Sequence, residues 1–180
     1  MPSLTKNDLY KMKPLSKYIG EELKLVQPSL FKREFEFSST TEVLAKMYYP
    51  KFFSLTAIVE GFGEKFEIFR PNFWKTELGI RRSGNELSFA GLTSNFFRTK
   101  GKISLSNGKI LNLKFGTFKR NCEIYSETGE LLIDIKTLFS FKDKNVVTVH
   151  RSSSLVDDNP WIIMMILYFL IENKKSGAAA

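Results

Sequence analysis

The sequence predicts an all-β fold in which an antiparallel sheet closes around one hydrophobic helix at the C terminus. Short segments of alternating apolar and polar residues, separated by Gly, Asn and Ser, fill most of the chain, as in sandwiches and barrels. The stretch "NPWIIMMILYFLIENKK" (159–175) follows them and is apolar on every side. Such a helix must be enclosed completely, and a sheet can enclose a helix only by closing around it.

The first segment, 1–22, is expected to be a basic leader, with a short helix interrupted by Pro14 and Gly20. It scatters lysines and polar residues where a signal peptide needs a continuous apolar core. The single cysteine, Cys122, has no partner for an internal disulfide. We therefore expect a cytoplasmic protein.

The segments after residue 22 predict one domain over 23–175. "KREFEFSS", "EVLAKMYY", "SLTAIVEGFG" and "EKFEIF" are short apolar or alternating runs, as expected of strands. The 17 Phe, 6 Tyr and 2 Trp favour strands over helices. A chain of 180 residues that is 43% hydrophobic can bury one sizeable core.

Two later segments predict β-hairpins of the same kind. "SNGKILNLKF" and "ETGELLIDIK" align position for position, with Gly108 and Gly129 as equivalents. Each glycine is expected to take the left-handed conformation at the end of a three-residue loop. "RSGNELSF", around Gly84, is a looser third copy. The short spacing of these hairpins predicts a meander of strands rather than a solenoid.

The Gly108 hairpin fixes side-chain directions if residues 106–108 form its loop. Lys109 then lies opposite Leu105, and Lys114 lies opposite Lys100. The inward face is expected to hold four apolar residues, Ile103, Leu105, Leu111 and Leu113. The outward face is expected to hold four cations without a compensating acid, Arg98, Lys100, Lys102 and Lys114. Facing like charges destabilise a sheet slightly, so the face either serves recognition or protects a strand edge from aggregation.

The charge of the chain is unevenly distributed. The formal net charge is +8, and residues 61–120 contain twelve basic and four acidic groups. No acid occurs between Glu86 and Glu123, where Lys119 and Arg120 extend the basic band of 98–120. This asymmetry indicates an anionic partner, although a solvated surface explains the charge count equally well.

The terminal helix is expected over about 160–175, followed by a disordered tail at 176–180. Asn159 and Pro160 are typical of a helix start, and Asp157 and Asp158 suit the positive end of its dipole. The apolar run 161–171 spans about 16 Å, roughly half of a bilayer core, so we expect no transmembrane span. The helix is expected to fill the core with Trp161, Ile162, Met164, Met165, Leu167 and Phe169.

The serial hairpins, "CEIYSETGELLIDIK" and "NPWIIMMILYFLI" together resemble the tubby-like barrel superfamily, which includes tubby C-terminal domains, phospholipid scramblases and LURP-one-related proteins. The resemblance covers roughly residues 23–175. It implies a closed antiparallel barrel of about a dozen strands around a hydrophobic C-terminal helix. Tubby domains bind phosphoinositide headgroups through basic surface residues, which implies a lipid-binding role here. The scramblases' link to calcium does not carry over, because Asp157 and Asp158 lack the alternating oxygen ligands of a calcium loop.

Residues typical of catalysis or metal binding are scarce. His150 is the only histidine, so neither a multi-histidine site nor a zinc cluster with Cys122 is expected. "RSSSLVDDNP" lacks a nucleophile elbow, and "EGFGEK" lacks the rest of a nucleotide fingerprint. We therefore expect neither enzymatic activity nor a metal or cofactor.

The leading hypothesis is a non-enzymatic module that docks on anionic lipid headgroups, peripherally at the inner membrane face. Its expected binding residues are Arg98, Lys100, Lys102, Lys114, Lys119 and Arg120. Nucleic-acid binding by the same band is the second hypothesis, with Phe96 and Phe97 as stacking platforms. The third is a carrier whose interior holds a small apolar ligand beside the helix.

Overall fold

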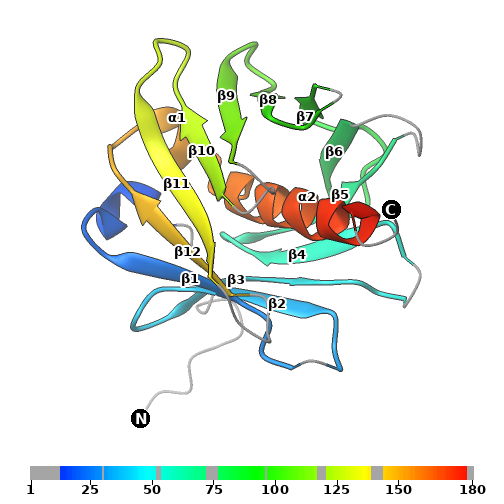
Figure 1. Cartoon of the computed structure of the whole chain (residues 1–180). Coiled ribbons are helices and arrows are strands. Elements are labelled where there is room, and N and C mark those ends of the chain that lie inside the picture. The colour runs from blue at the N-terminus through cyan, green and yellow to red at the C-terminus, as the bar shows by residue number, and fades with distance from the viewer. Residues whose placement is uncertain are drawn as a thin grey trace.

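Twelve antiparallel strands form a closed barrel, and a helix runs through its middle (Figure 1). The structure is a computed structural model that describes residues 13–29, 31–51, 54–71, 77–95, 97–116, 121–138 and 144–177. The helices are η1 (Leu15–Tyr18), α1 (Ser154–Asp157) and α2 (Ile162–Gly177). The strands are β1 (Glu22–Val26), β2 (Glu34–Ser38), β3 (Val43–Tyr48), β4 (Ala57–Gly61), β5 (Glu64–Phe69), β6 (Glu77–Arg82), β7 (Ala90–Ser94), β8 (Lys100–Ser104), β9 (Ile110–Phe115), β10 (Asn121–Tyr125), β11 (Leu131–Leu138) and β12 (Lys144–Val149).

The strands follow one another around the barrel in chain order, and β1 closes it by pairing with β12. Closure leaves the sheet without an unpaired edge. The predicted fold class, an antiparallel barrel of about a dozen strands with a C-terminal helix, is therefore confirmed.

The Gly108 hairpin has the predicted register. The Leu105 amide donates to the Lys109 carbonyl at 2.9 Å, and Lys100 pairs with Lys114. Gly108 and Gly129 have φ angles of 78° and 85°, the left-handed region that glycine enters without strain. The four residues expected on the inward face are buried: Ile103, Leu105, Leu111 and Leu113.

The helix α2 is buried on every side. Its residues from Ile162 to Asn173 are all less than 9% exposed, and so are the six side chains expected in the core, Trp161, Ile162, Met164, Met165, Leu167 and Phe169. Aromatic pairs fix it along its length, with ring centroids 5.3 Å apart for Phe89–Trp161 and 4.8 Å for Phe115–Phe169. In the described part of the chain, no helix combines the length and apolarity needed to cross a membrane.

The start of α2 differs from the expected one. The Asn159 side chain donates to the Leu155 carbonyl at 2.9 Å, so it closes the short helix α1 instead of capping α2. The first i to i−4 bond runs from the Met165 amide to the Trp161 carbonyl at 3.1 Å. The prediction of an Asn159 N-cap is wrong because α2 begins at Ile162, two residues later than a cap at Asn159 requires.

Both ends of the domain extend beyond the expected limits. β1 begins at Glu22, and Leu15 of the expected leader is only 1% exposed. The Ser16 amide donates to Asp157 Oδ1 at 2.8 Å, which ties η1 to α1. At the other end α2 continues to Gly177, beyond the expected end at residue 175, and residues 178–180 of the expected tail lie outside the described residues.

The antiparallel meander gives the barrel two distinct rims. One, the helix-start rim, consists of the connections 39–42, 62–63, 83–89, 105–109 and 126–130, with η1 and α1. The other, the helix-end rim, consists of the described residues between the remaining strands, 27–29, 31–33, 49–51, 54–56, 70–71, 95, 97–99 and 116, together with Leu138 at the end of β11 and the end of α2. The Tyr168 hydroxyl of α2 donates to the Leu55 carbonyl at 2.6 Å and so anchors the helix to this second rim.

Candidate anion-binding site

The outward face of β8 and β9 carries three exposed lysines, Lys100, Lys102 and Lys114. Lys100 begins β8 and pairs with Lys114 across the strands, so the two lie beside the helix-end rim. The expectation that no acid accompanies them is wrong, because Glu123 pairs with Lys114 on β10 and lies 3.8 Å from its Nζ. The Lys114–Glu123 ion pair is long and both side chains are exposed, so it contributes little to stability.

Arg98 does not belong to this outward face. It lies in the turn before β8 with a φ of 53°, and its Nη1 donates to Asn173 Oδ1 at 2.6 Å. The left-handed backbone turns the side chain toward the end of α2 instead of along the strand. Burial, and then the charge of Arg70, lower the pKa of Arg98. Two other expected members of the basic band, Lys119 and Arg120, lie outside the described residues.

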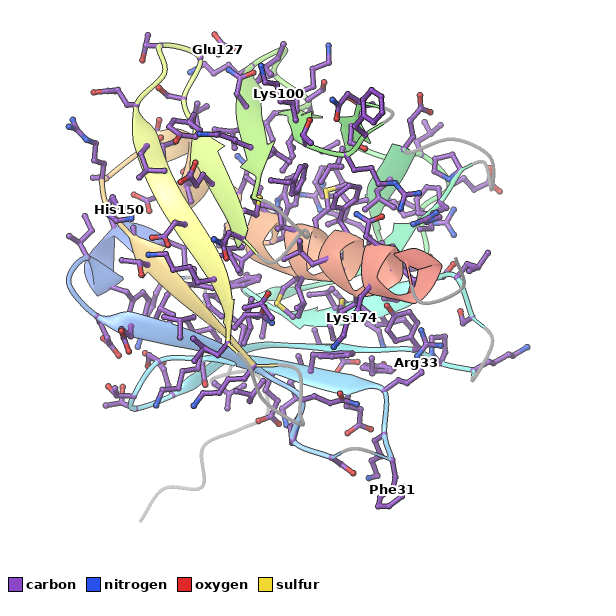
Figure 2. The ribbon with its side chains drawn as sticks, viewed as in Figure 1. Phe31, Arg33, Lys100, Glu127, His150 and Lys174 are labelled. Atoms are coloured by element: carbon purple, nitrogen blue, oxygen red, sulfur yellow. The ribbon has the colours of Figure 1, made fainter. Side chains whose placement is uncertain are left out.

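Arg33 also reaches the end of α2. Its guanidinium carbon lies 3.6 Å from the centroid of the Tyr49 ring, a cation–π contact, and its Nη2 lies 3.5 Å from Glu172 Oε1. The Tyr49 hydroxyl donates to the same carboxylate oxygen at 3.1 Å. Figure 2 shows Arg33 and Lys174 near the last turns of α2. Glu172 thus holds Arg33 in one orientation.

Arg70 completes the group. Its guanidinium lies close enough to the Tyr168 hydroxyl to lower the pKa of that group, which burial raises first and the Glu172 charge raises further, to about 12. Arg70 Nε is buried and has no hydrogen-bond acceptor among the described residues, and the same holds for Nδ2 of Asn173. Such buried donors without an acceptor are rare in folded proteins and call for an explanation.

We call Arg33, Arg70 and Arg98 the arginine cluster. Of the described acids, Glu172 is the carboxylate that contacts it. The C terminus of α2 adds about half a negative charge. Three guanidinium charges therefore exceed the combined negative charge of Glu172 and the helix terminus by about one and a half. A half-buried excess of this kind attracts an anion, because guanidinium groups bind oxyanions through two parallel hydrogen bonds.

The helix-end rim also exposes large apolar side chains. Phe31 is 99% exposed and Phe97 is 75% exposed, and Leu55 and Leu138 on the same rim are 44% and 42% exposed. Figure 2 shows Phe31 projecting away from the barrel. Cations lie beside these residues in the sequence, as Lys32 and Arg33 follow Phe31. Exposed apolar groups with neighbouring cations are typical of surfaces that bind a membrane or another partner.

A signal for this rim is present in the sequence, although our sequence reasoning missed it. Each of the six sequence segments 27–33, 49–56, 70–76, 95–99, 116–120 and 139–143 contains at least one Phe and at least one Lys or Arg. None of the five strand-to-strand connections of the helix-start rim contains both. The pattern is invisible along the chain because the six segments are separated by complete hairpins. It becomes apparent only when alternate connections are grouped, as the antiparallel meander requires.

His150 and Cys122, the two residues considered for catalysis or metal binding, lie in different surroundings. His150 Nε2 lies 2.6 Å from Oδ1 of the buried Asp134, whose other oxygen lies 3.2 Å from Lys136. Cys122 is fully buried, and burial raises the pKa of its thiol. Among the described residues, no three His, Cys, Asp or Glu side chains gather as a metal site would require.

A pocket of about 130 Å³ opens at the helix-start rim beside Trp161. Its lining includes the charged side chains of Glu64, Arg82 and Asp158. It is therefore a polar surface hollow, unlike the apolar space beside the helix that a carrier of a small apolar ligand needs.

The protein is thus a closed antiparallel β-barrel around a helix, and arginines and exposed phenylalanines lie at the rim where the helix ends. The chain is similar in structure to a protein from Arabidopsis thaliana of known X-ray structure, with a TM-score of 0.56. The two share 15% sequence identity, and the similarity covers 83% of this chain and 93% of the Arabidopsis chain. At this identity the likeness shows the fold alone. No protein-family model and no curated protein matches the sequence.

Proposed function

We propose that this protein is a non-enzymatic, tubby-like binding module that docks on anionic phospholipid surfaces through its helix-end rim. Lys100, Lys102 and Lys114 extend the docking surface along β8 and β9. The proposed target is the inner face of a cytoplasmic membrane. Anionic lipids there attract clustered cations with about 1 kcal/mol per Lys or Arg.

The observation that carries the proposal is the exposure of Phe31 and Phe97 on the rim that also holds the arginine cluster. An exposed phenylalanine is unfavourable in water, but it is stabilised when it enters the boundary between headgroups and acyl chains. Cations beside it then meet the lipid phosphates. Either kind of residue alone has an ordinary explanation, whereas the two together match a membrane interface.

Binding to vesicles of phosphatidylcholine, with and without phosphatidylserine, tests the proposal. We expect binding to require phosphatidylserine and to weaken as salt rises, because salt screens exposed charges. The double variant Phe31→Ser and Phe97→Ser should bind at least about tenfold more weakly, since each buried Phe contributes about 1.5–3 kcal/mol at full burial. The matched control is Leu87→Ser, which removes an apolar side chain that is 84% exposed on the helix-start rim. This control should bind like the wild type.

Two results would contradict the proposal. Equal loss of binding in the Leu87→Ser control would show that the rims do not differ in their contact with lipid. Binding to single-stranded oligonucleotides but not to vesicles, with the phenylalanine variant defective, would favour the nucleic-acid hypothesis, because bases also stack on aromatic side chains beside cations.

A further inference from the structure

We propose that the arginine cluster is a binding site for one phosphate group, with Arg70 and Asn173 as its innermost donors. The inference rests on the proposed docking function and deepens it, because it places a site for a phosphomonoester inside the basic rim. The ligand chemistry is a dianionic phosphate, supplied by a lipid headgroup such as that of phosphatidic acid or by free phosphate.

The first argument is the pair of buried donors without acceptors. Arg70 Nε and Asn173 Nδ2 lack an acceptor among the described residues, and Asn173 is only 2% exposed. Leaving a buried donor unpaired is unfavourable, and more so when the group is charged. The other end of the same amide, Asn173 Oδ1, is already occupied by Arg98. A phosphate oxygen would provide the missing acceptor.

The second argument is that the cations are already held in place. Arg33 is fixed by the Tyr49 ring and by Glu172, and Arg98 is fixed by Asn173. Because Asn173 and Glu172 belong to a helix that the whole barrel encloses, these guanidinium groups are oriented before a ligand arrives. A site that is organised in advance loses less entropy on binding than mobile surface lysines do.

The third argument is charge. The three guanidinium charges, less the charge of Glu172 and of the helix terminus, leave about one and a half positive charges before Lys174 is counted, enough to balance the charge of about −1.5 to −2 that a phosphomonoester carries at neutral pH. A phosphodiester carries one negative charge and leaves part of the excess unbalanced. The Arg33 side chain is 26% exposed, so the cluster is accessible from the rim.

The first experiment compares vesicles of phosphatidylcholine with either phosphatidic acid or phosphatidylglycerol, a phosphodiester. We expect the wild type to prefer phosphatidic acid. Arg70→Lys keeps the charge but lacks the planar guanidinium, so it should retain phosphatidylglycerol binding and bind phosphatidic acid about tenfold more weakly. Arg151→Gln, which removes an exposed arginine paired with Glu130 outside the helix-end rim, should keep the wild-type preference.

The comparison separates the two proposals. If the Phe31→Ser and Phe97→Ser variant binds both lipids more weakly but still prefers phosphatidic acid, the substitutions have removed docking contacts without affecting the phosphate site. An unchanged phosphatidic acid preference in Arg70→Lys overturns the phosphate site and leaves docking as it was.

The second experiment measures the melting temperature in inorganic phosphate against chloride at equal ionic strength. A saturable rise that disappears in Arg70→Lys supports the site and shows that free phosphate is sufficient as a ligand. A phosphatidic acid preference without this rise also supports the site and assigns the headgroup as the source. Absence of both effects in the wild type overturns the proposal. If the Arg70 variant does not fold, Arg98→Lys provides the same readouts, with the same outcomes.

Discussion

At the helix-start rim no connection between strands combines a phenylalanine with a cation, whereas at the helix-end rim Phe31 is followed by Lys32 and Arg33, and Phe97 is followed by Arg98. Both rims close the same meander and enclose the same helix (Figure 1). The difference shows that closing the barrel does not require the chemistry of the second rim. The exposed Phe31 and Lys32 of the helix-end rim are therefore not needed to close the barrel.

The two rims also differ in the contacts that hold their turns and side chains in place. At the helix-start rim Gly108 and Gly129 occupy left-handed positions, and Asp157 accepts the Ser16 amide. These contacts pair turns and helix ends within the fold. At the helix-end rim Glu172 contacts Arg33, and Asn173 accepts a hydrogen bond from Arg98. The first set stabilises the barrel, and the second orients arginines of the proposed phosphate site.

The largest expected effect tests whether both rims depend on the same helix. Met165 is fully buried in the middle of α2, so Met165→Asp places a carboxylate without a partner in the core. We expect destabilisation by more than about 4 kcal/mol, enough to abolish folding. Met165→Leu, which conserves volume, should cost less than about 1.5 kcal/mol. Circular dichroism and urea unfolding provide the measurement, and a folded Met165→Asp protein would contradict the enclosed helix.

A smaller effect is expected on the stability of the protein at alkaline pH, through Tyr168 of the helix-end rim. Burial first, and then Glu172, raise the pKa of Tyr168 to about 12, above an unfolded value of about 10. The native state therefore holds this proton more tightly than the unfolded state does. The resulting stability is complete below pH 10 and is lost as the pH rises from about 10 to 12, by about 2–3 kcal/mol.

The measurement is the free energy of unfolding against pH for the wild type and for Tyr168→Phe. Burial also raises the pKa of Tyr49 and of Tyr18, so the difference between the two proteins isolates Tyr168. This difference should change between pH 10 and 12. A constant difference over this range would show that Tyr168 ionises as readily in the native state as in the unfolded chain.

The smallest effect concerns the lysines beside the rim. Lys100→Gln with Lys114→Gln removes two facing like charges, so stability should stay the same or rise by a few tenths of a kcal/mol. Binding to phosphatidylserine vesicles should weaken by about 1–2 kcal/mol, less at high salt. The control removes two cations outside the helix-end rim, through Lys109→Gln and Arg151→Gln, and should leave binding unchanged. Equal losses in both double variants would indicate diffuse attraction by net charge.

The sequence predicted the hairpin geometry well because that geometry is local. Loop length and one left-handed glycine specify which residues pair, so the opposition of Lys100 and Lys114 followed from the position of Gly108 alone. The prediction failed for Arg98 because the positive φ at that residue redirects its side chain toward Asn173, 75 residues later in the chain. It also failed at Glu123, whose pairing with Lys114 depends on the register of the next hairpin.

The class of fold could be predicted from the pattern of apolar residues alone. Period-two segments required a sheet, and an apolar helix without a polar face required complete enclosure, because burial of apolar surface is the dominant favourable term in folding. The location of the proposed binding site could not be predicted in this way, because it depends on how the strands are arranged in space. Arg33, Arg70 and Arg98 are separated by whole hairpins, and they meet because the meander returns alternate connections to one rim, where the buried helix presents Glu172 and Asn173 to them.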